Sequence, residues 1–197
     1  MKRNTEKSAE QLSDERREQI KRAALKVFAI RGIEGTKMSM IAAEAGISQG
    51  LSYRYFNSKE EIFSLLVQEA IDEAQSAIRT VSELPGTPKE QLLAFTQRML
   101  DDNHKYHFLL LQHGFTSEVV PLQAKLSLEQ YKPEETIEHF VPLFTKGQER
   151  GEFRTGDPQK LLFLYFSVVT GLMLQHYDLP PNYWQQQVSD LMRIIMK

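Results

Sequence analysis

The stretch over residues 36–59 constrains the fold most, because it places two short helical patterns on either side of a glycine. Ile41 and Ala45 share one face of a first predicted helix. That helix ends at Gly46, where a left-handed backbone suits a residue without Cβ. Ser48 is a favourable N-cap for a second helix that begins at once. The spacing predicts two helices that cross steeply, as in a helix-turn-helix motif.

The second predicted helix carries side chains suited to a nucleic-acid surface. Gln49, Tyr53, Arg54 and Tyr55 follow the N-cap closely, and such groups contact bases and phosphates. Small residues and a glycine also end many ordinary helical hairpins in protein cores. The motif alone therefore leaves both interpretations open.

The charge of the chain is unevenly distributed. Residues 1–57 contain 11 Lys and Arg against 7 Asp and Glu, a net charge of +4. The remaining 140 residues contain 13 and 19, a net charge of −6. Only a segment that binds nucleic acid has to neutralise phosphates. The asymmetry favours a DNA-binding head on a body that does not bind DNA.

The composition argues against several other classes of protein. The chain has no cysteine, which excludes a disulfide framework and a thiolate metal site. Its N-terminus lacks the apolar stretch of a signal peptide, and no apolar run approaches the roughly 18 residues that span a bilayer. Gly-rich phosphate loops, zinc-protease motifs and nucleophile elbows are absent as well. We therefore expect an intracellular, cytoplasmic protein with no catalytic residues, not an enzyme.

The N-terminal third is predicted to form an arm and an amphipathic helix before the motif. Residues 1–12 are polar and lack periodicity, so we expect a flexible basic arm. A helix follows from Ser13 and ends near Gly32, with an apolar stripe along one face. Arg16 and Arg17 lie near its start, where a phosphate could bind.

The rest of the chain is predicted to be helical, and the expected fold class is all-α. Ser58 and Glu61 form a capping-box pattern that begins a long connecting helix over 58–83. Proline and glycine breaks then delimit helices over 88–104, 106–115, 118–130, 134–150, 158–178 and 182–196. The prediction is a three-helix DNA-binding domain over 13–57 and a larger helical bundle over 58–197, with about nine to ten helices in total.

The first 65 or so residues resemble the TetR family of bacterial transcriptional regulators. The residues that match the family's head pattern in register are Phe28, Gly32, Thr36, Ile41, Ala42, Ala45, Gly46, Ile47, Ser48, Gly50, Tyr53, Tyr55, Phe56, Ser58, Lys59 and Ile62. Two residues depart from the pattern. Ser52 stands where the family usually has an aliphatic residue, and its hydroxyl could bond the carbonyl of Ser48. Ser39 stands where a longer polar residue is frequent.

The resemblance implies which residues face DNA. The candidates are Thr36, Ser39, Ser48, Gln49, Gly50, Leu51, Tyr53, Arg54, Tyr55 and Lys59. Gln49 is the candidate for direct readout, because its amide can pair with adenine, and Leu51 could touch a thymine methyl. Tyr53 and Lys59 are expected at phosphates, whereas Tyr55 could equally pack in the core.

The resemblance also implies a homodimer and a ligand site in the body. The expected dimer interface lies on the two C-terminal helices and involves Leu161, Leu164, Tyr165, Val168, Leu172, Trp184, Val188 and Leu191. Candidate ligand-binding residues are Phe95, Met99, His104, Phe108, His113, Phe115, Phe140, Phe144, Tyr165, Met173 and Tyr177, although each could instead be plain core. These aromatic residues favour an apolar or aromatic small molecule.

The function implied is that of a ligand-responsive transcriptional repressor that binds a palindromic DNA operator as a homodimer. The alternative is a DNA-binding protein with the same head and no small-molecule effector. No cofactor is expected. The spacing of His104 and His107 is that of a metal pair, but no third ligand is indicated, so we expect no metal.

Overall fold

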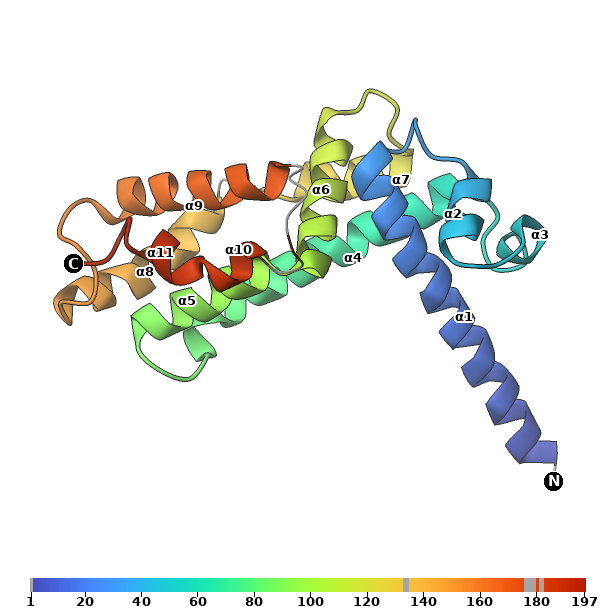
Figure 1. Ribbon diagram of the computed structural model, residues 1–197, viewed down its shortest axis with the longest axis horizontal. Helices are drawn as coiled ribbons and strands as arrows, with labels where there is room; N and C mark the ends of the chain where they lie inside the picture. The colour runs from blue at the N-terminus through green and yellow to red at the C-terminus, as the bar shows by residue number, and fades with distance from the viewer. Residues whose placement is uncertain (1, 133–134, 176–179, 181–182) are drawn as a thin grey trace. The chain divides into compact units, whose positions relative to one another are not determined.

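The computed structural model describes residues 2–132, 135–175, 180 and 183–197, and these residues form an all-α fold (Figure 1). The elements are α1 (Lys2–Arg31), α2 (Met38–Glu44), α3 (Gln49–Ser52), α4 (Lys59–Thr80), a 3₁₀ turn (Val81–Glu83), α5 (Pro88–Met99), α6 (Asp102–Thr116), α7 (Leu122–Gln130), α8 (Glu135–Glu149), α9 (Pro158–Leu174), α10 (Tyr183–Gln186) and α11 (Val188–Met192). The predicted fold class is confirmed. Within the described part of the chain, no helix is long and apolar enough to cross a membrane.

The described residues divide into two compact units. The helix-turn-helix unit comprises residues up to Ala70 together with Leu110–Leu128. The C-terminal unit comprises Ile71–Leu109 and Glu129–Lys197. The helix-turn-helix unit extends beyond the predicted domain over 13–57, because it also includes the start of α1, about half of α4, the end of α6 and most of α7.

Helix α1 begins at Lys2, where the sequence predicted a flexible arm over 1–12. Polar residues without periodicity suggested the arm, but the segment contains neither glycine nor proline, and six of its twelve residues are Lys, Glu, Ala or Gln. These residues favour a helix on local grounds even without a buried face. The helix therefore continues upstream of Ser13 instead of starting there.

The core of the helix-turn-helix unit gathers around α1. Phe28 is fully buried and meets the ring of Phe63 on α4 edge to face, with centroids 5.2 Å apart. The end of α6 contacts the end of α1, where the Nε2 of His113 donates to the carbonyl of Ala29 at 3.1 Å. Since a carbonyl only accepts, this bond fixes the proton of His113 on Nε2. The contact explains why part of α6 belongs to this unit.

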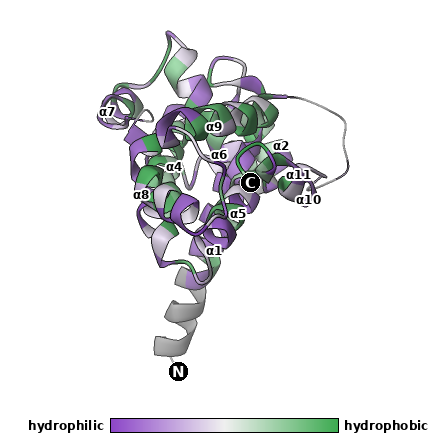
Figure 2. Ribbon diagram, turned by 90° about the vertical axis from the view of Figure 1, so that its left-hand side faces the viewer, coloured by the Kyte–Doolittle hydropathy of each residue, from purple (hydrophilic) through white to green (hydrophobic). Residues whose placement is uncertain are grey.

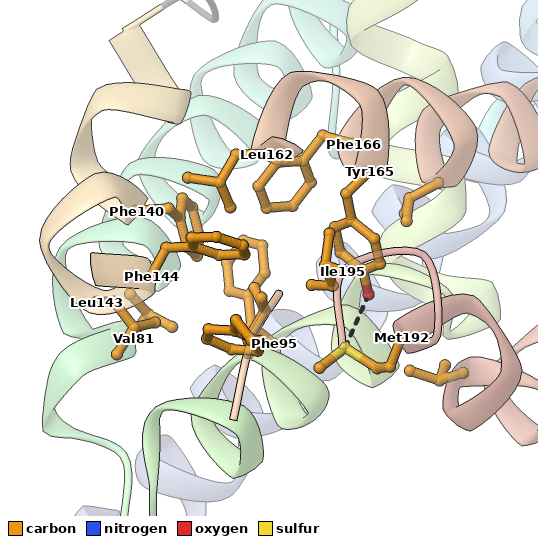
Figure 3. Close-up of a cluster of buried hydrophobic side chains, with 14 of the residues drawn as sticks. Val81, Phe95, Phe140, Leu143, Phe144, Leu162, Tyr165, Phe166, Met192 and Ile195 are labelled. Atoms are coloured by element: carbon orange, nitrogen blue, oxygen red, sulfur yellow. Dashed lines mark hydrogen bonds between the residues drawn. The ribbon is translucent and has the colours of Figure 1, made fainter. Parts of the chain in front are cut away.

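The C-terminal unit is built around a cluster of buried apolar side chains from α5, α8, α9 and α11 (Figure 3). Phe140 lies at its centre, with ring centroids 4.7 Å from Phe95 and 5.0 Å from Phe166. The hydroxyl of Tyr165 lies 2.8 Å from that of Thr96 and 3.2 Å from the sulfur of Met192. Apolar packing holds this cluster together, and Tyr165 makes buried polar contacts with Thr96 and Met192 inside it.

Several helix boundaries differ from the prediction for local reasons. Helix α7 starts at Leu122 rather than at 118, and its first turn closes with a bond from Lys125 N to Pro121 O at 2.9 Å. The predicted break between 88–104 and 106–115 lies earlier in the structure, where α5 ends at Met99 and α6 begins at Asp102. Asp101 caps α6, because its Oδ1 accepts from His104 N. Helix α9 ends at Leu174, where Gln175 turns to extended backbone.

The single helix predicted over 182–196 is replaced by α10 and α11, with a turn at Gln187. Bonds between residues three apart, such as Gln187 N to Trp184 O, take the place of the regular ladder. After Met192 the chain forms an isolated bridge between Phe153 and Met196. No glycine or proline marks these breaks, so local sequence did not reveal them.

Candidate nucleic-acid interface

The two helices of the motif are joined as the sequence predicted. Gly46 has a φ of 66°, in the left-handed region that a residue without Cβ adopts readily. Ser48 is the N-cap of α3, and its hydroxyl accepts from Leu51 N at 3.2 Å. Ile41 and Ala45 are buried against the rest of the unit. The predicted helix-turn-helix is confirmed at these positions.

Helix α3 presents its N-terminal end and one side to solvent. Ser48, Gln49 and Gly50 are exposed, and nothing lies within 4 Å of the position that a Cβ on Gly50 would take. Tyr53 and Arg54 are exposed beyond the helix, whereas Leu51 and Tyr55 are half-buried. This surface has both the hydrogen-bonding groups and the open access needed to enter a major groove.

Two of the predicted DNA contacts, Thr36 and Lys59, have other surroundings. Thr36 is fully buried, and its hydroxyl donates to Gly32 O at 2.6 Å, so it stabilises the turn after α1. The ammonium of Lys59 donates to Ile33 O at 2.7 Å and to Thr36 O at 2.8 Å. Lys59 thus ties α4 to this same turn, where the sequence suggested a phosphate contact. Ser39 is exposed on α2.

Ser52 is buried at the position where the TetR pattern has an aliphatic residue. Its hydroxyl donates to Gln49 O at 2.7 Å. The predicted acceptor, Ser48 O, is instead occupied by the backbone N–H groups of Leu51 and Ser52. The polar atom is therefore satisfied within α3, and the departure from the pattern leaves no buried donor unpaired.

Sequence reasoning missed two side chains of α1 that contact the motif. Gln19 Nε2 donates to Ala45 O at 2.6 Å, and Arg17 Nη1 donates to Tyr55 O at 2.9 Å. The position of Arg17 near the start of the predicted helix instead suggests a phosphate contact. Both bonds join residues far apart in the sequence, so no local pattern indicates them.

The predicted ligand-binding residues do not gather in one place. Phe95, Phe140, Phe144, Tyr165 and Met173 belong to the buried cluster of the C-terminal unit, and Met99 and Phe108 pack against it. His113 lies in the other unit, bonded to α1, and Phe115 is exposed. Tyr177 lies outside the described residues.

His104 and His107 meet a carboxylate on α4. Glu73 lies 3.0 Å from His104 Nε2, 3.2 Å from His107 Nδ1 and 3.0 Å from Arg98 Nη2. Burial alone would raise the pKa of Glu73, but the bond from Arg98 and the two histidines outweigh it and lower the pKa. Among the described residues, no group of three His, Cys, Asp or Glu has a metal-site arrangement.

The predicted dimer residues divide into exposed and internal ones. Leu164 and Val168 are exposed on α9, and Leu161, Leu172, Trp184 and Leu191 are half-buried. Tyr165 and Val188 are fully buried in the C-terminal cluster, so they belong to the core of one chain. Phe163, which the prediction omitted, is exposed beside Leu164. Figure 2 shows α9 as one of the most hydrophobic helices.

An exposed helix-turn-helix on an all-helical chain defines a DNA-binding transcriptional regulator. The family model of bacterial regulatory proteins of the tetR family matches residues 20–66, which contain α2, α3 and the flanking parts of α1 and α4. Residues 20–66 therefore form a DNA-binding domain of the TetR type, as the resemblance in the sequence predicted.

Curated relatives extend the similarity beyond the motif. The HTH-type transcriptional activator FasR of Mycolicibacterium smegmatis is 30% identical over 120 residues, 59% of this chain and 55% of FasR. The HTH-type transcriptional repressor KstR2 of Mycobacterium tuberculosis is 24% identical over 162 residues, 82% of this chain and 81% of KstR2. The fatty acid metabolism regulator protein of Bacillus subtilis is 28% identical over 146 residues, 70% and 71% of the two chains.

A solved structure shares the fold over almost the whole chain. The structure of the ketosteroid transcriptional regulator KstR2 of Mycobacterium tuberculosis matches with a TM-score of 0.65 at 22% identity. The match covers 92% of this chain and 95% of that one. The fold of the helical body is therefore shared as well as that of the head.

Proposed function

We propose that the protein is a transcriptional repressor that reads its operator with α3 and releases DNA when a small apolar ligand binds the body. The observation that carries the proposal is the open face of α3, where Gln49 and Gly50 are exposed and Tyr53 and Arg54 flank them. In this reading the amide of Gln49 pairs with a base edge, and the flanking side chains contact phosphates.

A homodimer accounts for the exposed apolar face of α9. Phe163 is 60% exposed, Leu164 56% and Val168 41%, and the three share one side of the helix. A groove of about 490 Å³ is lined by Phe163 and Leu164 of α9 and by Ile137 of α8. A second copy that packs α9 against α9 would bury this face. Two heads would then read a palindromic operator, since one α3 spans only a few base pairs.

The proposed effector is an apolar or aromatic molecule. The body is rich in aromatic side chains around Phe140, and apolar pockets bind apolar ligands. Two of the relatives carry names that refer to ketosteroids and to fatty acid metabolism. These names concern those proteins, and they suggest hydrophobic molecules as the first compounds to test on this chain.

A DNA-binding protein without an effector is the second candidate, and one observation favours it. Phe95, Phe140 and Tyr165, which sequence analysis placed at a ligand site, pack closely against one another or against Thr96 and Met192. These side chains already pack against one another, so they do not require a bound ligand to fill the space between them.

Selection of bound fragments from the organism's genome tests the proposal. The protein should enrich palindromic sites, and Gln49→Ala should relax preference at one position in each half-site, at a cost of about 1–3 kcal/mol for the preferred base. Loss of affinity that is equal for the selected and a random duplex would contradict readout by Gln49. Sedimentation should give a dimer, and Phe163→Glu should give a monomer.

The two candidate functions differ in their response to hydrophobic compounds. If the protein is a repressor with an effector, one of a panel of steroids and fatty acids should raise its melting temperature. The same concentration of that compound should also dissociate the protein from its operator. The melting temperature of a protein without an effector should stay constant across the panel of steroids and fatty acids.

A further inference from the structure

Helix α3 is too short to fix its own position. It has four residues, about one turn, and a single turn gains too few hydrogen bonds to be stable alone. Its orientation on DNA therefore depends on contacts outside the helix. Two side chains of α1 supply such contacts, one on each side of α3.

The first contact precedes α3. Gln19 Nε2 donates to the carbonyl of Ala45, the C-cap residue of α2, at 2.6 Å. Carbonyls at a helix C-terminus lack partners within the helix, so this bond satisfies one of them. Arg16 Nη1 donates to Gln19 Oε1 at 2.7 Å. That second bond fixes which end of the amide faces Ala45, because only the NH₂ group can donate to the carbonyl.

The second contact follows α3. Arg17 Nη1 donates to Tyr55 O at 2.9 Å, and the guanidinium carbon lies 4.1 Å from the centre of the buried Phe56 ring. A charge-assisted bond and a cation–π contact hold the same group. The side chain is half-buried in this arrangement, so its charge is directed at the motif.

We propose that Gln19 and Arg17 are positioning residues for DNA recognition, holding the segment from Ala45 to Tyr55 at both ends so that α3 meets the groove in one orientation. The inference rests on the proposed function, because it concerns how the operator is read. It assigns to Arg17 a role in sequence-specific binding, which depends on the orientation of α3. A phosphate contact would instead strengthen binding to every sequence.

The test compares full-length Arg17→Met and Gln19→Met with Arg22→Met, which removes a charge from the exposed face of the same helix. Binding is measured on the selected operator and on a random duplex at several salt concentrations. Arg17→Met and Gln19→Met should each bind the operator about tenfold more weakly, with the salt slope and random-duplex affinity unchanged. Arg22→Met should keep the parent's ratio of operator to random affinity.

Two results overturn the inference. One is a salt slope lowered by about 1 in Arg17→Met with equal losses on both duplexes, which identifies a phosphate contact. The other is unchanged operator affinity in both variants. If circular dichroism shows that Gln19→Met is unfolded, Gln19→Asn replaces it, since it keeps the amide but withdraws it by one methylene.

Hydrogen exchange separates this inference from the proposed function. Without DNA, the amides over 46–55 should exchange faster in both variants than in the parent, while those of the buried half of α1 should not change. If the parent fails to prefer the selected operator, the proposed function fails, and the exchange rates still decide whether α1 holds α3. Equal exchange rates in the parent and both variants would refute the positioning role.

Discussion

In the helix-turn-helix unit, side chains of α1 and α4 donate to backbone carbonyls next to α2 and α3, whereas the centre of the C-terminal unit is a large cluster of aromatic and aliphatic side chains. Gln19, Arg17 and Lys59 each reach a carbonyl near the ends of α1, α2 or α3. In the C-terminal unit, rings such as Phe140 and Phe166 meet over wide apolar surfaces.

Helices α2 and α3 are positioned differently from α8 and α9. Helices α2 and α3 have seven and four residues, so their apolar faces are too small to define an orientation. Hydrogen bonds, which require a fixed geometry, define the orientation of these two helices instead. Helices α8 and α9, with 15 and 17 residues, bury enough apolar side chains to be positioned by packing alone. The comparison predicts that the two units respond to different substitutions.

The largest effect is expected in the C-terminal unit. Phe140→Ala removes the ring at the centre of the buried cluster and should lower the free energy of unfolding by about 3–5 kcal/mol. Trp184, the one tryptophan of the chain, packs against this cluster, so its fluorescence reports urea denaturation of this unit. The exposed Phe163→Ala should change the same transition of the monomer by less than about 0.5 kcal/mol. Similar losses in both variants would contradict a packed cluster.

A smaller effect is expected at Lys59. Lys59→Met keeps the length of the side chain but leaves Ile33 O and Thr36 O without their donor, so the helix-turn-helix unit should lose about 2–3 kcal/mol. Circular dichroism should show that the helix-turn-helix unit unfolds at a lower urea concentration, while the midpoint of the Trp184 fluorescence transition is unchanged. The salt slope of DNA binding should not change, and a slope lowered by about 1 would restore the phosphate role that the sequence suggested.

The smallest effect concerns the polar contact inside the C-terminal cluster. Burial raises the pKa of Tyr165 to about 12, against the opposing bond with Thr96. A phenol with a raised folded pKa contributes stability that is present below its unfolded pKa of about 10 and is lost as pH rises toward 12.

Tyr165→Phe should therefore cost about 1 kcal/mol at neutral pH and flatten the decline in stability between pH 10 and 12. Urea denaturation of parent and variant at matched pH values measures both. An equal decline in the two proteins would show that Tyr165 does not control the alkaline transition.

The sequence predicted those features that depend on neighbouring residues. Gly46 and Ser48 set the turn and the cap of α3 through contacts within four residues, and both were found as expected. The capping box after Asn57 was half correct. Glu61 N donates to Ser58 Oγ, but the carboxylate of Glu61 accepts from Asn57 N at 2.8 Å.

The features that sequence reasoning missed depend on contacts between distant residues. Lys59 lies 26 residues from Ile33, and Gln19 lies 26 from Ala45. Residues 110–128 join the helix-turn-helix unit through His113, 84 residues from its acceptor Ala29. Local patterns carry no information about such pairs, because each depends on how whole helices pack.

The way α3 is held also bears on how its specificity can be altered. The bonds from Gln19 and Arg17 go to backbone carbonyls at Ala45 and Tyr55, not to side chains of α3. The solvent-facing positions of that helix can therefore be randomised without removing either of these two bonds. A library at Gln49, Gly50 and Tyr53 in an unchanged α1 background would yield a set of regulators that differ in operator and share one scaffold.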